Sequence, residues 1–512
     1  MSKSQSSKTK MKQSKLPTWD LSHLYSGPED KAIKADLNWL EKEIEKFARL
    51  YSEKVGSLKA EQLALAIVAY EKIEEKIGKL GSYAQLLFAE NMNIPEHAQL
   101  YQNITEKLTE LNSSLLFFTL DLNKIPEKKF QALISESSKL AHYASWLREV
   151  RQMKLYQLDD KLERLLLEKS VTGHNAWSRL FDETLAGLRF PYKGKQLTSE
   201  EILNHFSSPK EQVRKDSAQV FGRVLGEHGR TFALIINTLA KDKHIEDQWR
   251  GFRLPIESRN VSNAVENEVV DALINSVKAH YPQLSHRYYK LKAKWFGSTK
   301  LDYWNRNAPL PGEDNTEYSW DAAKDLVLSS YTAFSPKLGK LGSKFFDNAW
   351  IDVPPRAGKA SGAFAHPTVP SAHPYLLLNF QKRTRDVMTL AHELGHGVHQ
   401  ILSAKQGALM ADTPLTLAET ASVFGEQLTF QEILRREKKA ARRKYLIASK
   451  VEDMLNTVVR QVAFCEFERR LHDQRKQGEL TLEQIGDIWM DVQKESLGSA
   501  LRFDKNYRMY WS

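Results

Sequence analysis

The sequence contains almost no cysteine. Among 512 residues only Cys465 carries a thiol, so no disulfide can form within the chain. Its neighbours in VAFCEFERRL follow the apolar spacing of a helix, a context in which a lone cysteine packs as a small apolar side chain. A disulfide framework is therefore excluded, and a reducing compartment is expected.

Long apolar runs are also missing. No stretch reaches the about 18 consecutive apolar residues of a membrane helix, and residues 1–15, MSKSQSSKTKMKQSK, lack the apolar segment of a signal peptide. These residues include five lysines, no acid and no arginine, a composition typical of disorder and unlike a mitochondrial transit peptide. The sequence therefore predicts a cytoplasmic protein without a membrane partner, with residues 1–15 as a disordered Lys/Ser-rich tail.

An excess of acidic residues is absent, and the formal net charge is +10 at pH 7. The tail alone supplies five of these charges. A second basic run, RREKKAARRK at residues 435–444, lies in a helical pattern and is typical of a solvated helix face. No base-reading motif or stacking-aromatic signature accompanies it. We therefore predict no nucleic-acid partner, because the hypothesis of a helical nucleic-acid binder rests on net charge alone.

Amphipathic helix patterns dominate the remainder. From residue 30 to about 180, apolar residues recur at three- and four-residue spacing, as in KADLNWLEKEIEKFARLYSEKV. Near residue 185 an alternating segment with a Lys-Gly turn precedes a Thr-Ser-Glu-Glu helix start, which predicts a β-hairpin followed by a helix. We predict a mainly α protein with a small β component, divided into an N-terminal helical domain at 16–200 and a second domain at 201–512.

Residues 353–380 differ from the chain before them. They are rich in Gly and Pro and end in an apolar run, Tyr375 to Phe380, which predicts a strand. An exposed strand can hold an extended peptide by backbone hydrogen bonds, so we interpret this strand as a substrate-binding edge, with an ordinary edge strand as the alternative. His366 and His373 flank it and are candidates for contacting a bound peptide or its tetrahedral intermediate.

The motif with the most specific chemistry is HELGH at residues 392–396. Apolar residues at helical spacing surround it, with Asp386 as the expected N-cap. At i and i+4 of a helix, His392 and His396 place their Cβ atoms about 5–6 Å apart, and both imidazoles can reach one zinc at about 2.0–2.1 Å. Glu393 stands beside the metal without binding it. Its carboxylate can take a proton from zinc-bound water and pass it to the leaving amine.

A catalytic zinc needs a third protein ligand. The metzincin pattern would place a histidine ten residues after His392, but that residue is Leu402. A second predicted helix, within TPLTLAETASVFGEQLTFQEIL, carries Glu419 and Glu426. These two lie about 10.5 Å apart along the axis, so one metal cannot easily take both. We predict Glu419 as the ligand and Glu426 as a group that supports the ligands.

Alternatives stay open around this choice. Asp412, in the loop before the second helix, is another candidate for the third ligand, although loops hold ligands less rigidly than helices. The second helix is expected to start with Thr413 as N-cap and Pro414 in its first turn. His399 follows His396 by three residues on the first helix, and we interpret it as a packing or supporting group rather than a ligand.

Four segments together resemble the oligoendopeptidase F branch of the thimet oligopeptidase-like zinc metallopeptidases: LPTWDLSHLY, GAFAHPTVPSAHPYLLLNF, DVMTLAHELGHGVH and LAETASVFGEQL. The resemblance covers residues 16–512 and implies a mostly helical, clam-like enzyme with a deep channel that admits short peptides. It also implies His392, His396 and Glu419 as zinc ligands. Glu393 would then be the general base.

The same resemblance carries an expectation about the end of the chain. Family members continue past a segment similar to FDKNYRMYWS into a helical stretch with a His and tyrosines that contact the substrate and the oxyanion, whereas this sequence ends at Ser512. The leading hypothesis is a zinc metalloendopeptidase, with one Zn²⁺ per chain, that hydrolyses short peptides. The alternative is a catalytically silent zinc- or peptide-binding protein whose catalytic domain is incomplete at the C-terminus.

Overall fold

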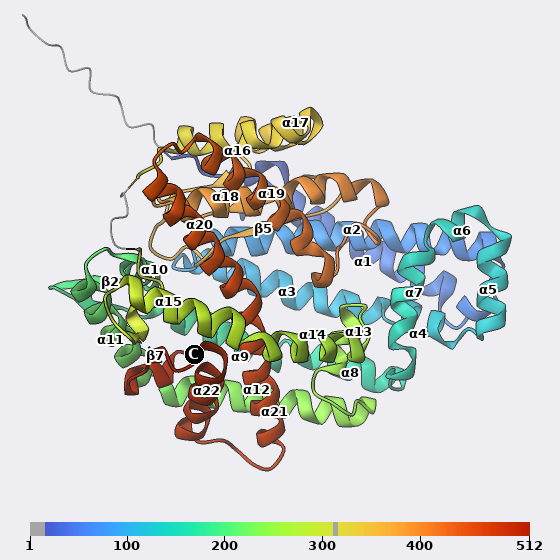
Figure 1. Cartoon of the computed structure of the whole chain (residues 1–512). Helices are drawn as coiled ribbons and strands as arrows, with labels where there is room; N and C mark the ends of the chain where they lie inside the picture. Colours follow the sequence, from blue (N-terminus) through green and yellow to red (C-terminus); the bar gives the residue numbers. More distant parts are fainter. Residues whose placement is uncertain (1–15, 311–315) are drawn as a thin grey trace, which may run out of the picture.

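The computed structural model describes residues 16–310 and 316–512, which fold into a mainly helical protein (Figure 1). The predicted disordered tail, residues 1–15, lies outside the described residues. The first elements are α1 (Lys31–Tyr51), α2 (Ala60–Glu90), α3 (Pro95–Leu115), α4 (Phe117–Lys124), α5 (Glu127–Glu136), α6 (Ser138–His142), α7 (Ala144–Gln152), α8 (Asp160–Ser170), α9 (His174–Gly187), β1 (Phe190–Tyr192) and β2 (Lys195–Leu197).

The chain continues through a second set of helices and short strands. The elements before the HELGH helix are α10 (Ser199–Asn204), α11 (Glu211–Glu227), α12 (Gly229–Arg250), α13 (Glu257–Ser262), α14 (Asn267–His280), α15 (Arg287–Trp295), β3 (Leu301–Asp302), α16 (Trp320–Phe334), α17 (Pro336–Asp347), β4 (Ile351–Asp352), β5 (Phe364–His366) and β6 (Tyr375–Leu377). The remaining elements are α18 (Thr384–Ser403), α19 (Leu415–Arg436), α20 (Ala440–Leu455), α21 (Gln461–Arg475), α22 (Leu482–Leu497) and β7 (Leu501–Arg502).

The predicted amphipathic helices bury the face on which their regularly spaced apolar residues lie. In α1 the buried residues are Ile33, Leu40, Ile44 and Phe47, which recur at three-, four- and seven-residue steps on one side of the helix. They join a hydrophobic cluster that continues through the helices up to α7. In Figure 1 these helices extend to one side of the molecule, while α11, α12, α21 and α22 lie below α16–α19.

The predicted β-hairpin and the helix after it are confirmed. Phe190 of β1 pairs with Leu197 of β2 in an antiparallel ladder. Thr198 then caps α10: its Oγ1 accepts from the amide of Glu201 at 3.3 Å, while Glu201 Oε2 accepts from the amide of Thr198 at 2.8 Å. Apolar residues of the hairpin pack with those of α11 and α12 in one cluster, and the division at residue 200 stays a prediction.

The strand before HELGH lies inside a sheet, not at its edge. The three-stranded sheet has the order β4-β6-β5, with β6 parallel to β4 and antiparallel to β5. The expected substrate-binding edge at Tyr375–Phe380 is therefore wrong, because both sides of β6 are already paired. The free edge beside α18 belongs to β5, whose Ala365 carbonyl accepts from Gln400 of α18 at 3.2 Å.

Strand β6 connects two hydrophobic clusters. Tyr375 and Leu377, on one face of the strand, pack with the N-terminal helices. Leu376 and Leu378, on the other face, pack with the core that holds α18. This alternation follows from the two-residue period of a strand, and it explains why the whole run is apolar, as expected for a strand buried on both faces.

Both helices of the predicted metal site form, but neither starts with the expected cap. Helix α18 begins at Thr384, so Asp386 lies in its first turn, where its carboxylate accepts from the amides of Gln381 and Arg383 at 2.8 Å. Helix α19 begins at Leu415, and Pro414 occupies the N-cap position expected for Thr413. The carboxylate of Asp386 thus satisfies free amides from inside the first turn, the place that favours acidic residues.

Glycines allow α18 and α19 to pack at very short distance. A Cβ added to Gly395 of α18 would lie 2.6 Å from the carbonyl oxygen of Ala421 on α19. A Cβ added to Gly425 of α19 would lie 1.9 Å from Tyr331 Oη, which itself donates to the carbonyl of Ala391 at 2.6 Å. The interaxial distance of two helices depends on the side chains between them, so these glycines set the spacing of the two helices.

Among the described residues, the structure contains no helix that is both long enough and apolar enough to cross a membrane.

Replacing Gly425 with Ala tests this packing. The new methyl group would overlap Tyr331 Oη, and overpacking of this kind destabilises a protein by about 1–3 kcal/mol. The higher helix propensity of alanine, about 1 kcal/mol, offsets only part of this loss. We expect a lower midpoint of urea unfolding. Gly187→Ala is the matched control, since a Cβ at this helical glycine meets nothing within 4 Å. Equal midpoints for both variants would contradict the role of Gly425.

Candidate active site

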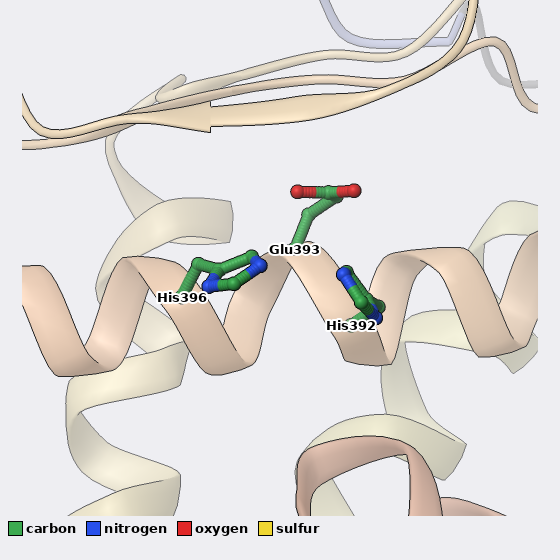
Figure 2. Close-up of side chains that lie close together, drawn as sticks. All are labelled: His392, Glu393 and His396. Carbon is green, nitrogen blue, oxygen red and sulfur yellow. The ribbon is translucent and has the colours of Figure 1, made fainter. Parts of the chain in front are cut away.

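The HELGH residues converge on one side of α18. One possible ligand atom each from His392, Glu393 and His396 lies within 4.8 Å of the others. Figure 2 shows the two imidazoles along the helix, with the Glu393 carboxylate between them and pointing toward the strand above. The spacing of i and i+4 therefore places both histidines as one helical face requires.

Glu419 reaches the same imidazoles from α19. Its Oε2 lies 3.2 Å from His392 Nε2 and 3.6 Å from His396 Nε2. A tetrahedral zinc with bonds of about 2.0–2.1 Å holds neighbouring ligand atoms about 3.3 Å apart, so these three atoms fit a zinc ligand set. The side chain of Glu419 is 60% exposed, which leaves this side of the site open to water and to a peptide.

A second carboxylate contacts His392 at Nδ1, the ring nitrogen that faces away from Glu419. Glu426 Oε1 lies 2.6 Å from His392 Nδ1. The proposed ligand Glu419 is held separately, because Ser422 Oγ donates to its Oε2 at 2.7 Å. A carboxylate at Nδ1 fixes the ring orientation and the tautomer, so that Nε2 is directed to a metal. Lys450 Nζ donates to the other oxygen of Glu426 at 2.9 Å. The sequence motifs gave no indication of Lys450, which lies on α20.

These contacts change the pKa values of the site residues. Burial alone would lower the pKa of His392, but hydrogen bonds with Glu419 and Glu426 outweigh it and raise the pKa to about 10. Hydrogen bonds with His392 and His396 hold the pKa of Glu419 well below its usual range. Burial opposes the same effect at Glu426, whose pKa is nevertheless lowered by His392 and Lys450. Both glutamates are therefore ionised at neutral pH, as metal ligation and ligand support require.

Glu393 differs from the other two glutamates. It is only 6% exposed, and burial raises the pKa of its carboxyl group to about 7, although the nearby His392 and His396 act in the opposite direction. A carboxyl group that titrates near neutral pH can both accept and return a proton there. Its environment therefore suits a general base rather than a permanent anion.

The two alternatives for ligands lie apart from this centre. Asp412 is exposed in the loop before α19, and its carboxylate accepts from the amide of Thr413 at 3.0 Å. His399 is half-buried one turn beyond His396. Glu419 lies within 3.6 Å of both imidazoles, whereas the printed contact of Asp412 is with the amide of Thr413, so the contacts support Glu419 over Asp412.

His366 and His373 hydrogen-bond with other groups of the chain. His366 Nδ1 accepts from the amide of Thr368 at 3.0 Å, and its Nε2 lies 3.2 Å from Gln85 Oε1. His373 Nε2 is 2.7 Å from His23 Nδ1, and its Nδ1 is 3.1 Å from the carbonyl of Pro374. Burial lowers the pKa of both His366 and His373 to about 4. Both imidazoles are therefore neutral at pH 7, and their contact with a bound peptide stays a prediction.

Solved structures with the same fold include two peptidases. The structure described as oligoendopeptidase-F from Enterococcus faecium aligns with a TM-score of 0.70 and 20% identity, covering 94% of this chain and 82% of that one. The structure described as PZ peptidase A with inhibitor 2 aligns with a TM-score of 0.74 and 16% identity, again over 94% of this chain and 82% of that one. They confirm the predicted mainly α, clam-like fold class.

Curated relatives match nearly the whole chain. Oligopeptidase PepF of Bacillus subtilis is 26% identical over 97% of this chain and 74% of its own length. An oligoendopeptidase F homolog of Borreliella burgdorferi is 26% identical over 95% of this chain and 82% of its own length. The predicted resemblance to the oligoendopeptidase F branch is thereby confirmed.

Two family models match the chain itself. The model described as Oligopeptidase F matches residues 121–190, a part of the N-terminal helices. The model described as Peptidase family M3 matches residues 204–512, which include the whole HELGH helix and both glutamates of α19. Because this second match spans more than half of the sequence, the chain belongs to peptidase family M3.

Proposed function

We propose that this protein is a zinc metalloendopeptidase that hydrolyses short peptides. The observation that carries the proposal is the convergence of His392 Nε2, His396 Nε2 and Glu419 Oε2 at distances that fit one zinc ion. The curated relatives bear the names oligopeptidase and oligoendopeptidase, which supports short peptides as the substrate class. A cytoplasmic location stays a prediction from the sequence.

The chemistry is divided between the metal and one carboxylate. When bound, zinc supplies Lewis-acid chemistry, which polarises a peptide carbonyl and lowers the pKa of water. Glu393 lies beside the two histidines, where its carboxylate would accept the proton of the attacking water and return it to the leaving amine. This carboxylate is buried beside both imidazoles, which is the position that both proton transfers require.

Strand β5 is our candidate for holding the peptide backbone. It is an edge strand of the sheet and contacts α18. An extended peptide that adds to this edge would run alongside the HELGH helix and would take the place of Gln400 at the carbonyl of Ala365. The substrate-binding edge that the sequence assigned to Tyr375–Phe380 is thus assigned to Phe364–His366.

The first test is Glu393→Gln. Glutamine keeps the size of the side chain but cannot accept the proton, and loss of a general base lowers a rate by about 10²–10⁴-fold. We expect the variant to retain zinc, measured by elemental analysis, and to lose cleavage of an internally quenched peptide. Glu227→Gln, at an exposed ion pair on α11, is the control and should cleave at the parental rate.

Two outcomes would reject this assignment in different ways. Equal cleavage rates for the parent and Glu393→Gln would exclude Glu393 as the base. Stoichiometric zinc and peptide binding by the parent, without turnover, would favour the alternative of a catalytically silent binding protein.

The second test is Glu419→Ala. Changes in groups that merely support metal ligands lower metal affinity by about 10–100-fold, and loss of a ligand should exceed that range. We expect a weaker zinc dissociation constant in a competition titration with a fluorescent chelator. Thr420→Ala changes the adjacent exposed residue of α19 and should bind zinc as the parent does. A variant at residue 419 with parental affinity would exclude Glu419 as a ligand.

A further inference from the structure

Lys450 lies on α20, outside both helices of the metal site, yet it contacts the group behind His392. Its Nζ is 2.9 Å from Glu426 Oε2 and 2.9 Å from Asp453 Oδ2. The other oxygen of Glu426 is 2.6 Å from His392 Nδ1. The side chains of Lys450 and Glu426 are 12% and 15% exposed, whereas that of Asp453 is 54% exposed. The buried contacts therefore run from Lys450 through Glu426 to His392.

A carboxylate held at both oxygens has a fixed direction. The terminal torsion of a glutamate is broad and about two-fold, so a single contact leaves the carboxylate of Glu426 free to turn. Lys450 occupies one oxygen and leaves the other for the N–H of His392 Nδ1. That hydrogen bond keeps the proton on Nδ1, so that a metal would replace the proton on Nε2 and bind there.

Charge balance supports the same role. The carboxylate of Glu426 is 15% exposed, and the ammonium group of Lys450 lies at the oxygen that does not contact His392. Without Lys450, the buried carboxylate of Glu426 would lose its compensating charge, which is unfavourable in a low-dielectric environment.

We propose that Lys450 is a positioning residue for the zinc site, acting on His392 through Glu426. The inference rests on the proposed zinc ligands. Its competitor is a purely structural role, in which the Lys450–Glu426 pair only ties α20 to α19. The two roles differ in one measurable respect: a structural tie changes the stability of the fold, whereas a positioning residue changes zinc affinity in a fully folded protein.

The experiment compares Lys450→Met and Lys450→Arg. Methionine keeps most of the apolar stem without the charge, and we expect its zinc dissociation constant to weaken by about tenfold, the lower end of the range for supporting groups. Arginine restores a cation and should recover most of the affinity. Lys243→Met is the control, since it removes a comparable Lys–Asp pair on α12. The visible spectrum of the Co²⁺-loaded protein should change in Lys450→Met alone.

A double variant makes the test specific to Glu426. If Lys450 acts through Glu426, adding Lys450→Met to Glu426→Gln should change zinc affinity by less than about twofold, because coupled residues are not additive. Parental zinc affinity in Lys450→Met, with only a lower melting temperature, would overturn the proposal. A parent that binds zinc but cleaves no peptide would reject the proposed function alone, whereas a parent that binds no zinc would reject both.

An apolar groove of about 500 Å³ lies between α15 and α20. Leu291 and Trp295 line it from α15, and Ile447, Ala448 and Val451 line it from α20. We call this the α15–α20 groove. Beneath it, Tyr288 and Lys292 of α15 both hydrogen-bond with Glu452 of α20 at 2.6 Å. These buried contacts fix the two helices on either side of the groove.

Exposed apolar residues continue along α20 in a regular pattern. Ile447, Val451 and Met454 follow one another on α20 at steps of four and three residues, and Val458 follows in the π-helical turn Asn456–Arg460; each is more than 40% exposed. This spacing is the seam that one helix presents to another. The groove therefore fits the apolar face of an amphipathic helix better than it fits a flat surface of a partner.

The rim of the groove is basic. Arg443 and Lys444 line it, and Lys444 Nζ stands 5.4 Å from the ring centre of Trp295. Arg443 donates to the backbone carbonyls of Leu434 and Glu437. In the part of the chain that the structure describes, neither cation forms an ion pair with a carboxylate. We infer that the α15–α20 groove binds an amphipathic helix with acidic flanks, supplied by a partner protein.

Two synthetic helical peptides test this inference. Both carry leucines at three- and four-residue spacing, one with glutamates and the other with lysines at the remaining positions. By fluorescence anisotropy, we expect the glutamate peptide to bind at least about tenfold more tightly, because only it complements the basic rim. Ile447→Asp with Val451→Asp should remove this binding, whereas Val269→Asp, at an exposed valine of α14, should keep it.

Three results would overturn the inference about the groove. They are equal binding of the two peptides, no binding of the glutamate peptide, or binding only to phosphatidylglycerol vesicles, which would indicate a membrane surface.

Discussion

Gly395 and Gly425 let α18 and α19 approach so closely that a methyl group on either would overlap atoms of the neighbouring elements. All three proposed zinc ligands depend on this spacing, since two lie on α18 and the third on α19. A wider separation would move Glu419 Oε2 beyond its present 3.2 Å and 3.6 Å from the imidazole nitrogens. The packing of backbone against backbone thus keeps the Glu419 carboxylate within reach of both imidazoles.

Glu419 and Glu426 of α19 contact the two ring nitrogens of one imidazole, that of His392. Two turns of helix separate these residues by about 10.5 Å along the axis, which is too far for one metal to bind both directly. His392 lies between them, with Nε2 toward Glu419 and Nδ1 toward Glu426. The seven-residue spacing therefore lets one helix present both the proposed metal ligand and the carboxylate that contacts the other nitrogen of His392.

The sequence predicts those features whose determinants are local. The i, i+4 spacing of HELGH is sufficient to place His392 and His396 on one face of α18, and the Thr198–Glu201 pattern is sufficient to predict α10. It does not predict Lys450, because only tertiary packing brings α20 to Glu426. Nor could it show that β6 is a central strand, because its partners β4 and β5 are two and three residues long and carry little pattern of their own.

The predicted N-cap residues of α18 and α19 were wrong for a related reason. Asp386 and Thr413 have the side chains that N-caps prefer. The residue at which each helix starts, however, also depends on how the preceding segment packs in the folded protein. Asp386 instead accepts amide hydrogen bonds from Gln381 and Arg383 while lying inside the first turn of α18. The element type was predictable at both places, whereas its boundary was not.

The shared strand β6 has a consequence for biosynthesis. Tyr375 Oη donates to the carbonyl of Asp20 across 355 residues of sequence, and the amide of Val353 donates to the carbonyl of Pro17. At about 5–20 residues per second, the segment at Asp20 leaves the ribosome roughly tens of seconds before its partner exists. During that interval the apolar surface that later covers Tyr375 and Leu377 remains without its partner strand, so nascent chains would need protection from aggregation until the sheet beside α18 is complete.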